Sequence, residues 1–248
     1  MEEKEILNRA GLLLGTEGMR RLSEVRIIIF GVGGVGSWCA ESLVRTGVKH
    51  LTIVDSDDVS VSNINRQLMA TTKTVGESKV EALRRHLLDI LPDAEIITRH
   101  ENYTKEREGE FNLEDYDVII DAIDSLKDKA TLIENATRCS GRFYSSMGAA
   151  LKCDPTRVRV AEFWQVKGCP LARALRNRFK KSGIFPGRKF KCVYSEELLS
   201  NEGQEWLDNV DNSHDLDRKA SINGSLMHIT AIFGLMLAGL AISEIVKR

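Results

Sequence analysis

The sequence predicts an α/β fold with a doubly wound, mostly parallel sheet. Short β-branched apolar runs alternate with helical patterns, most clearly at residues 25–30 and 51–54. Continuous runs of this kind are typical of parallel strands buried on both faces. A glycine cluster at residues 31–36 stands where the first strand must turn into a helix. We therefore expect a Rossmann-like fold, with a C-terminal antiparallel extension and a final buried helix.

The glycine cluster predicts a phosphate-binding turn. Gly31 permits the tight turn, Gly33 and its neighbour Gly34 allow close approach, and Gly36 lets the helix pack on the strand. The helix N-terminus then presents unpaired N–H groups to an anion. Asp55 ends the second strand, where a carboxylate can accept ribose hydroxyls. This pattern indicates a nucleotide and leaves NAD and ATP both open.

Length, charge and cysteine usage set broad limits. The 248 residues suffice for one large α/β domain or a domain with an appended lobe, and the net charge of −1 is uninformative. No two cysteines are spaced as CxxC, which argues against a tetrathiolate zinc site. The odd number of scattered cysteines and the charged N-terminus predict a cytoplasmic protein. The cysteines are Cys39, Cys139, Cys153, Cys169 and Cys192.

The apolar run at residues 229–242 requires a membrane check. It is short for a transmembrane span, which needs roughly 20 apolar residues. We expect a buried helix at about residues 222–246, in which Gly234 and Gly239 allow close contact with the sheet, and no stable transmembrane insertion. Peripheral membrane association stays open.

The chain begins with helical spacing over residues 2–22, which Gly11, Gly15 and Gly18 divide into short pieces. By itself, Arg9 is interpreted as a surface arginine. The polar connection at residues 55–67 is long for a compact domain, and such connections are usually functional.

A helix is expected at residues 76–91, with Lys79 near its N-terminus. A lysine there opposes the helix dipole, and a bound phosphate would turn that cost into a benefit. An ordinary solvated lysine is the alternative.

Three further strands are expected at residues 95–98, 116–120 and 142–146, with a helix at residues 127–139. Asp121 and Asp124 follow the second of these strands. Because ligands bind outside the carboxyl ends of parallel strands, one carboxylate is expected to bond locally and the other to hold Mg²⁺. A helix N-cap at Asp124 or Ser125 would explain only one of them.

Residues 151–248 are expected to complete the domain that residues 1–150 begin. A helix is predicted at residues 170–181, and the basic charge of the chain is concentrated on it and just after it. A polyanion surface and a solvated helix face are both compatible with this block. The acidic residues 200–221 are expected to form a flexible loop. The candidate RNA-binding residues are Arg173, Arg176, Arg178, Lys180, Lys181, Arg188 and Lys189.

Five motifs occur in a fixed order: GVGGVGS at 31–37, VDSD at 54–57, SNINRQ at 62–67, VGESK at 75–79 and DAIDS at 121–125. Together they resemble the adenylating superfamily of ubiquitin-activating-type enzymes. In the second half, DPTRV at 154–158, PLARALR at 170–176 and CVYS at 192–195 resemble the tRNA threonylcarbamoyladenosine dehydratases. The lack of paired zinc cysteines agrees with that branch, whereas Cys169 stands where members usually carry an acid.

The resemblance implies ATP and Mg²⁺ as cofactors, with a monovalent cation as a further candidate. It places Asp55 on the ribose, Arg66 and Lys79 on the phosphates, and Asp124 on the metal. Asn63 and Gln67 would fix the nucleotide loop, and Asp57 and Asp121 complete the implied site. Arg9 matches an arginine that reaches the ATP of a partner subunit, which implies a homodimer.

The implied reaction begins when the threonyl carboxylate of modified adenosine 37 in tRNA attacks the α-phosphate of ATP. Pyrophosphate leaves, and the neighbouring ureido group then attacks the acyl-adenylate, closes a ring and releases AMP. Proximity favours this ring closure, so no enzyme nucleophile is required. Cys192 or Cys169 could serve if a thioester were formed, but burial is expected for both.

Three other functions stay open at this point. The closest alternative is an adenylating activator of a ubiquitin-like sulfur carrier, and a sulfur-transfer-system protein is a candidate partner beside tRNA. An NAD-dependent oxidoreductase is opposed by Arg66 and Lys79. The third alternative is a scaffold protein that senses a nucleotide without turning it over.

Overall fold

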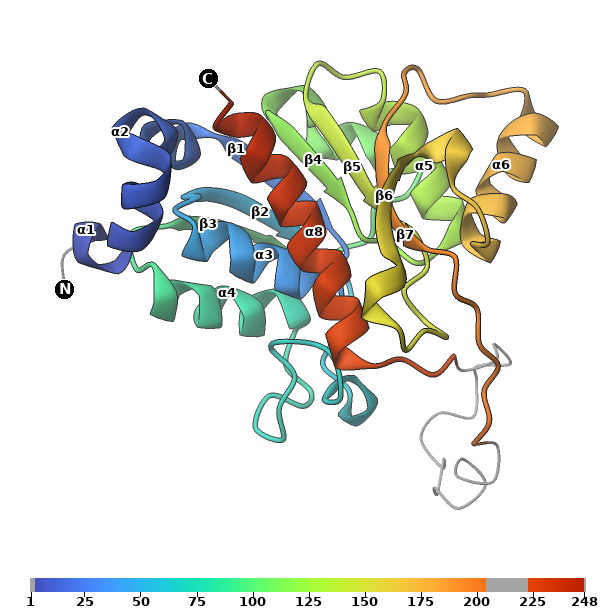
Figure 1. Cartoon of the computed structure of the whole chain (residues 1–248), viewed down its shortest axis with the longest axis horizontal. Helices are drawn as coiled ribbons and strands as arrows, with labels where there is room; N and C mark the ends of the chain where they lie inside the picture. Colours follow the sequence, from blue (N-terminus) through green and yellow to red (C-terminus); the bar gives the residue numbers. More distant parts are fainter. Residues whose placement is uncertain (1–2, 204–222, 248) are drawn as a thin grey trace.

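The computed structural model describes residues 3–203 and 223–247. Within them, a seven-stranded sheet runs in the order β3-β2-β1-β4-β5-β7-β6 (Figure 1). All neighbouring pairs are parallel except β6 and β7, which pair antiparallel. This confirms the predicted fold class. The strands are β1 (Arg26–Phe30), β2 (His50–Val54), β3 (Glu95–Arg99), β4 (Val118–Asp121), β5 (Arg142–Ser146), β6 (Val158–Glu162) and β7 (Lys191–Ser195).

Helices cover both faces of the sheet (Figure 1). Short 3-10 helices, η1 to η5, lie in the connections. The α-helices are α1 (Glu3–Ile6), α2 (Asn8–Glu24), α3 (Gly36–Arg45), α4 (Lys79–Ile90), α5 (Leu126–Ala136), α6 (Pro170–Ser182) and α8 (Met227–Ile245). The 3-10 helices are η1 (Val61–Asn63), η2 (Glu108–Phe111), η3 (Leu113–Asp115), η4 (Pro155–Arg157) and η5 (Phe163–Gln165).

The direction of winding reverses at β1. From β1 the chain moves outward to β2 and β3, then returns to form β4 on the other side of β1. At such a reversal the two flanking connections leave in opposite directions and open a crevice at the carboxyl ends of the strands. The glycine turn after β1 and the loop after β4 both lie at this crevice.

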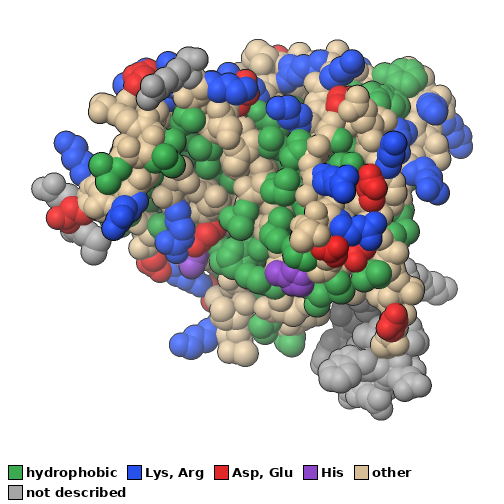
Figure 2. All heavy atoms as spheres, in the orientation of Figure 1, with side chains coloured by type: hydrophobic (Ala, Val, Ile, Leu, Met, Phe, Trp, Pro, Cys, Tyr) green, Lys and Arg blue, Asp and Glu red, His purple; other side chains and the backbone are tan. Residues whose placement is uncertain are grey.

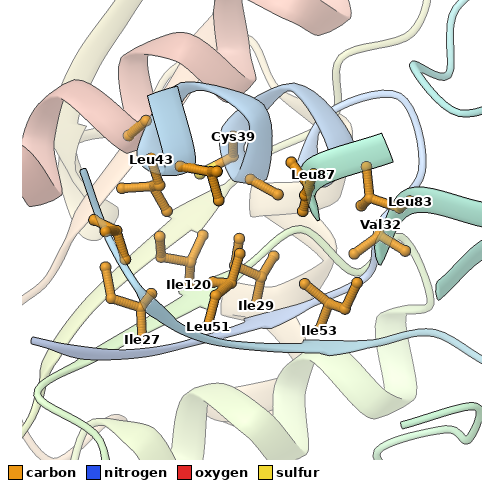
Figure 3. Packing of buried hydrophobic residues seen from close by; sticks show 14 of the residues in the cluster. Ile27, Ile29, Val32, Cys39, Leu43, Leu51, Ile53, Leu83, Leu87 and Ile120 are labelled. Carbon is orange, nitrogen blue, oxygen red and sulfur yellow. The ribbon is translucent and has the colours of Figure 1, made fainter. Parts of the chain in front are cut away.

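Alternate residues of β1 enter two separate cores. Ile27 and Ile29 belong to the cluster beneath α3, α4 and α8. Ile28 and Phe30 belong to the cluster on the α5 and α6 side. Figure 3 shows the first cluster, with sheet residues facing side chains of α3 and α4. Both cores fix β1, so the turn that follows it has a rigid base.

The final helix, α8, packs closely against the start of α3. A Cβ at Gly234 would lie 2.3 Å from the backbone oxygen of Val35, so only glycine fits against the start of α3. The matching expectation for Gly239 is wrong, because a Cβ there would meet no atom within 4 Å. Of the described helices, α8 alone is long and apolar enough to span a membrane, but half of that stretch is buried in the fold.

Several predicted boundaries shift. The N-terminal helical region is interrupted at Leu7, between α1 and α2, and at Gly15, which adopts φ +71°, while Gly11 and Gly18 stay helical. Helix α4 begins at Lys79 because its N-cap, Ser78, has a non-helical backbone with ψ 130°. Strand β7 contains the CVYS motif at 192–195, for which the sequence predicts no strand. Most of the loop expected at 200–221 lies outside the described residues, as does the first residue of the predicted final helix.

Candidate nucleotide site

The glycine turn has the geometry that its sequence predicted at two positions. Gly31 adopts φ +83°, and a Cβ there would lie 2.8 Å from the backbone oxygen of Ala122. A Cβ at Gly36 would lie 1.8 Å from the backbone oxygen of Gly31. Any side chain at either position would therefore push the turn away from the β4 loop or open it. Gly34 instead packs against Thr230 of α8.

Gly33 faces a buried side chain with an unused acceptor. A Cβ at Gly33 would lie 3.6 Å from Nε2 of Gln67. Among the described residues, Oε1 of Gln67 is buried without a hydrogen-bond partner. A buried amide oxygen normally has a donor, and losing that bond costs about 1–3 kcal/mol. An N–H or O–H group of a bound nucleotide would satisfy it, so this corner of the turn fits a nucleotide.

Asp55 links β2 to the glycine turn. Its Oδ2 accepts the backbone N–H of Val32 at 2.8 Å, and its Oδ1 accepts that of Asp57 at 3.0 Å. Burial raises the pKa of Asp55, while the positive charge of Lys79 opposes that shift. The carboxylate is therefore held rigidly beside the turn, where the sequence placed a ribose contact.

Lys79 is not a solvated surface lysine. The residue is only 5% exposed, and its Nζ lies 2.7 Å from Oδ2 of Asp57 and 3.9 Å from Oδ1 of Asp55. The side chain of Asp57 remains half exposed. Lys79 therefore has one close partner, Asp57, and both solvent and a ligand can reach that carboxylate.

The loop after β2 holds Asn63 and Arg66. Oδ1 of Asn63 accepts the backbone N–H of Ser60 at 3.1 Å and closes η1. Arg66 is half buried, and its Nη1 donates to the backbone oxygen of Ser62 and to Oδ1 of Asn65, each at 2.9 Å. Burial lowers the pKa of Arg66, and the negative charge of Asp124 opposes this shift. Arg66 and Asp124 are therefore close enough to interact across the crevice.

Asp124 is exposed in the loop between β4 and α5. The N-cap of α5 is Ser125, whose Oγ accepts the backbone N–H of Asp128, so Asp124 is not required as a cap. Among residues 3–203 and 223–247, no cluster of three or more potential metal-ligating side chains occurs. Mg²⁺ is usually held by one or two carboxylates together with substrate phosphates, and Asp124 fits such a site.

Asp121 does not reach the crevice. Its residue exposure is 0%, Oδ2 contacts Nζ of Lys129 at 2.7 Å and Oγ of Ser145 at 2.6 Å, and Oδ1 accepts the N–H of Ile123 at 3.1 Å. Burial raises the pKa of Asp121, and Lys129 opposes that shift. The expected direct nucleotide contact by Asp121 is therefore replaced by a structural one, because β4 directs this side chain into the interior.

Lys129 was missed in the sequence. It lies on the same helical face as Ile133 and Ala136, both fully buried, which placed a lysine within an apolar stripe. A lysine on that apolar stripe indicates a buried charge, and buried charges are normally paired, so the sequence did carry a signal for an ion pair at Lys129.

Arg9 is exposed on α2, and none of the contacts described for residues 3–203 and 223–247 joins it to the glycine turn of its own chain.

The candidate RNA-binding residues on and after α6 divide into two groups. Arg176 donates to the backbone oxygens of Phe163 and Val166 at 3.1 and 3.0 Å, and Arg188 donates to those of Cys139 and Gly141. These two arginines therefore have a structural role, since each bonds to backbone oxygens of another segment of the chain. The exposed basic residues are Arg173, Arg178, Lys180, Lys181 and Lys189.

The cysteines with a possible catalytic role are buried. Cys169 is 2% exposed and Cys192 is 0% exposed. Burial raises the pKa of Cys192 well above its ordinary value, which disfavours the reactive thiolate. The expectation of structural burial is confirmed for both.

A separate cavity of about 290 Å³ lies at the amino ends of β1 and β2, where Arg26, His50 and Tyr116 line it. The glycine turn lies at the opposite edge of the sheet. The ligand-binding edge of open parallel sheets is the carboxyl edge, so we assign the nucleotide site to the crevice and not to this cavity.

The profile of the ThiF family matches residues 7–248. The chain belongs to the ThiF family. A tRNA threonylcarbamoyladenosine dehydratase of Bacillus subtilis is 34% identical over 241 residues, which cover 97% of this chain and 94% of that protein. A crystal structure of the Escherichia coli tRNA N6-threonylcarbamoyladenosine dehydratase in complex with ATP superposes with a TM-score of 0.84 at 29% identity. It covers 98% of this chain and 94% of that one.

A second group of relatives matches only part of the chain. An adenylyltransferase and sulfurtransferase of Culex quinquefasciatus is 34% identical over 113 residues, which cover 46% of this chain and 26% of that protein. The Bacillus subtilis dehydratase and the crystallised Escherichia coli dehydratase instead match 97% and 98% of this chain. The resemblance inferred from the sequence motifs is thereby confirmed.

Proposed function

We propose that this chain is an ATP-dependent tRNA threonylcarbamoyladenosine dehydratase. The observation that carries the proposal is the match to dehydratases over nearly the whole chain, of which one has been crystallised with ATP. The crevice supports it, because Asp55 bonds to the glycine turn, Lys79 lies 3.9 Å from Asp55, and the charges of Arg66 and Asp124 interact. The substrate is N6-threonylcarbamoyladenosine at position 37 of tRNA, and its dehydration to the cyclic form releases AMP and pyrophosphate.

The site residues divide the work of binding and activation. Asp55 accepts ribose hydroxyls, and Gln67 contacts the nucleotide through its unpaired Oε1. Lys79 exchanges Asp57 for phosphate oxygens, and Arg66 turns from the carbonyl of Ser62 toward the phosphates. These cations offset the negative charge that develops when a carboxylate attacks the α-phosphate.

Asp124 is the residue that would hold Mg²⁺, which would neutralise phosphate charge when bound. After adenylation, the ureido group attacks the acyl carbon, the bond from that carbon to the AMP oxygen breaks, and the ureido proton is lost. Both groups belong to one nucleoside, so attack is intramolecular. The buried thiols of Cys169 and Cys192 agree with a route that has no thioester.

The active form is proposed to be a homodimer in which Arg9 reaches the partner's nucleotide. Leu12 and Leu13, three and four residues beyond Arg9 on α2, are each 83% exposed, so the same helix face offers apolar surface. Figure 2 shows further hydrophobic side chains gathered along α8. A second copy would cover these surfaces. A cytoplasmic location, a monovalent cation and a sulfur-transfer-system partner remain part of the proposal.

The deciding experiment is mass analysis of tRNA nucleosides after incubation with ATP, Mg²⁺ and the protein. We expect loss of one water from N6-threonylcarbamoyladenosine and stoichiometric AMP. Unmodified tRNA is the control and should yield no AMP. If AMP formation required a ubiquitin-like carrier protein and ignored tRNA, the sulfur-carrier activator would be the better assignment. If ATP bound without any turnover, a nucleotide-sensing scaffold would be.

Subunit complementation tests Arg9. Arg9→Ala and Lys79→Ala proteins should each be nearly inactive. Mixing them creates heterodimers in which one site has both residues intact, so we expect activity to return to about one quarter of the parent value by random subunit exchange. Exchange is verified by native mass spectrometry of differently tagged subunits. No recovery after verified exchange would contradict action in trans.

Charge reversal tests the exposed basic face of α6. Arg178→Glu combined with Lys180→Glu should weaken tRNA binding and reduce its salt dependence by roughly one unit of slope per lost phosphate contact. Binding titrations at several salt concentrations provide the measurement. Lys73→Glu, an exposed position away from α6, is the matched control. An unchanged slope would leave α6 as a solvated face.

A further inference from the structure

A buried ion pair lies beneath the loop that carries Asp124. The side chains of Lys129 on α5 and Asp121 on β4 are both 0% exposed, and Nζ of Lys129 lies 2.7 Å from Oδ2 of Asp121. Ser145 on β5 donates its hydroxyl to the same oxygen at 2.6 Å. The chemistry proposed above uses neither charge.

Both members of the pair hold the residue that precedes Asp124. Nζ of Lys129 donates to the backbone oxygen of Ile123 at 2.9 Å, and Oδ1 of Asp121 accepts the backbone N–H of Ile123 at 3.1 Å. The ion pair thus holds both polar backbone groups of Ile123. A rotation of the backbone at this residue would break at least one of these bonds.

The same segment is pressed against the glycine turn. Ala122 donates its N–H to the backbone oxygen of Phe30 at 2.8 Å, and its carbonyl oxygen lies 2.8 Å from the position that a Cβ on Gly31 would take. The chain from Asp121 to Ile123 is therefore tied to β1 and α5 before it reaches Asp124. Asp124 itself is exposed, so its direction depends on this backbone.

Stability does not explain the choice of charged residues. A buried ion pair loses hydration, and well-packed apolar residues of similar volume are often as stabilising or more so. The pair does offer what apolar side chains lack, an acceptor for the N–H and a donor for the C=O of one residue. The hydrogen bonds from Lys129 and to Asp121 together fix the backbone orientation of Ile123.

We propose that Lys129 and Asp121 are positioning residues that aim the Asp124 carboxylate at the metal–phosphate site beside Arg66. They act on the backbone of Ile123 and touch neither nucleotide nor metal. The inference rests on the ATP and Mg²⁺ site of the proposed function and is independent of the substrate that receives the adenylyl group.

The test uses the charge-neutral double variant Asp121→Asn/Lys129→Met. Asparagine keeps an acceptor for the N–H of Ile123, while methionine removes the donor to its carbonyl. Calorimetric titrations measure ATP affinity with and without Mg²⁺, and electron paramagnetic resonance measures binding of Mn²⁺ to the ATP complex. We expect metal binding to weaken by about tenfold or more, as for losses of residues that orient metal ligands, with metal-free ATP affinity changed less than twofold.

Two comparisons separate positioning from general damage. Lys127→Met removes an exposed lysine of the same helix and should leave metal binding unchanged. In an Asp124→Asn background, the double variant should cause no further loss, because its effect is exerted through Asp124. A fully additive loss, or unchanged metal binding in a double variant with parental thermal stability, would overturn the proposal.

Lys129→Arg is the second variant in case the double variant unfolds. It keeps the charge but displaces the donor, so metal binding should weaken while the fold is retained. Parental metal binding in Lys129→Arg would also overturn the proposal. These binding measurements need no tRNA, so a failed dehydratase assay would not affect their outcome.

Discussion

Two carboxylate–lysine clusters stand at the carboxyl ends of neighbouring parts of the sheet, and they differ mainly in access to solvent. After β2, Lys79 lies 2.7 Å from Asp57, whose side chain is 55% exposed. After β4, Lys129 lies 2.7 Å from Asp121, and both side chains are 0% exposed. Lys79 can therefore exchange Asp57 for a ligand, whereas Lys129 cannot exchange Asp121. Access, not residue type, separates a ligand-binding lysine from a positioning lysine.

The largest effect is expected for Lys129→Met alone. It leaves Asp121 buried without its counter-charge, and breaking a buried pair in this way typically costs about 3–5 kcal/mol. Urea denaturation followed by circular dichroism measures the change. The double variant with Asp121→Asn should recover much of that loss. A single variant as stable as the parent would show that the pair is far better solvated than its burial indicates.

Lys79→Met should produce the opposite pattern. Its partner Asp57 is open to water, so stability should change little, while turnover should fall by about 10²–10³-fold, as when one charge-stabilising group is removed from an active site. AMP release with modified tRNA measures turnover, and Lys73→Met, at an exposed position in the connection before α4, is the control. Parental turnover in folded Lys79→Met protein would contradict the phosphate assignment.

The smallest effect is expected from Asp55, which lies 3.9 Å from Lys79 in the cluster after β2. Burial raises its pKa in the folded state, so the folded protein retains this proton to higher pH than the unfolded chain. The stability contribution of Asp55 is therefore greatest below the unfolded pKa of about 4 and declines as pH rises through the folded value.

Asp55→Asn removes this titration. The difference in unfolding free energy between parent and variant should shift against the parent as pH rises from 4 to 7, and urea midpoints at each pH provide the measurement. A difference that moved in favour of the parent would mean that Lys79 outweighs burial at Asp55.

Local sequence patterns were sufficient for much of the fold. The alternation of apolar runs and helical patterns predicted the parallel strands, and the spacing of glycines predicted the turn, because both depend on interactions between near neighbours. Strand β7 was missed because residues 191–195 gain their strand character from pairing with β5 and β6, which lie far away in sequence. Gly239 was misjudged because its exposure depends on which face of α8 meets α3.

The sequence by itself determined the nucleotide site to the level of motifs: a glycine turn, Asp55, Arg66, Lys79 and Asp124 in a fixed order. It assigned Asp121 as well as Asp124 to the nucleotide site, and Arg176 as well as Arg178 to the RNA-binding residues, since members of each pair have the same charge and nearly the same place in the chain. Only the tertiary structure decided between them, by burying Asp121 against Lys129 and turning Arg176 onto backbone carbonyls. Burial depends on what packs against a residue, and that information is distributed over strands and helices far apart in the sequence.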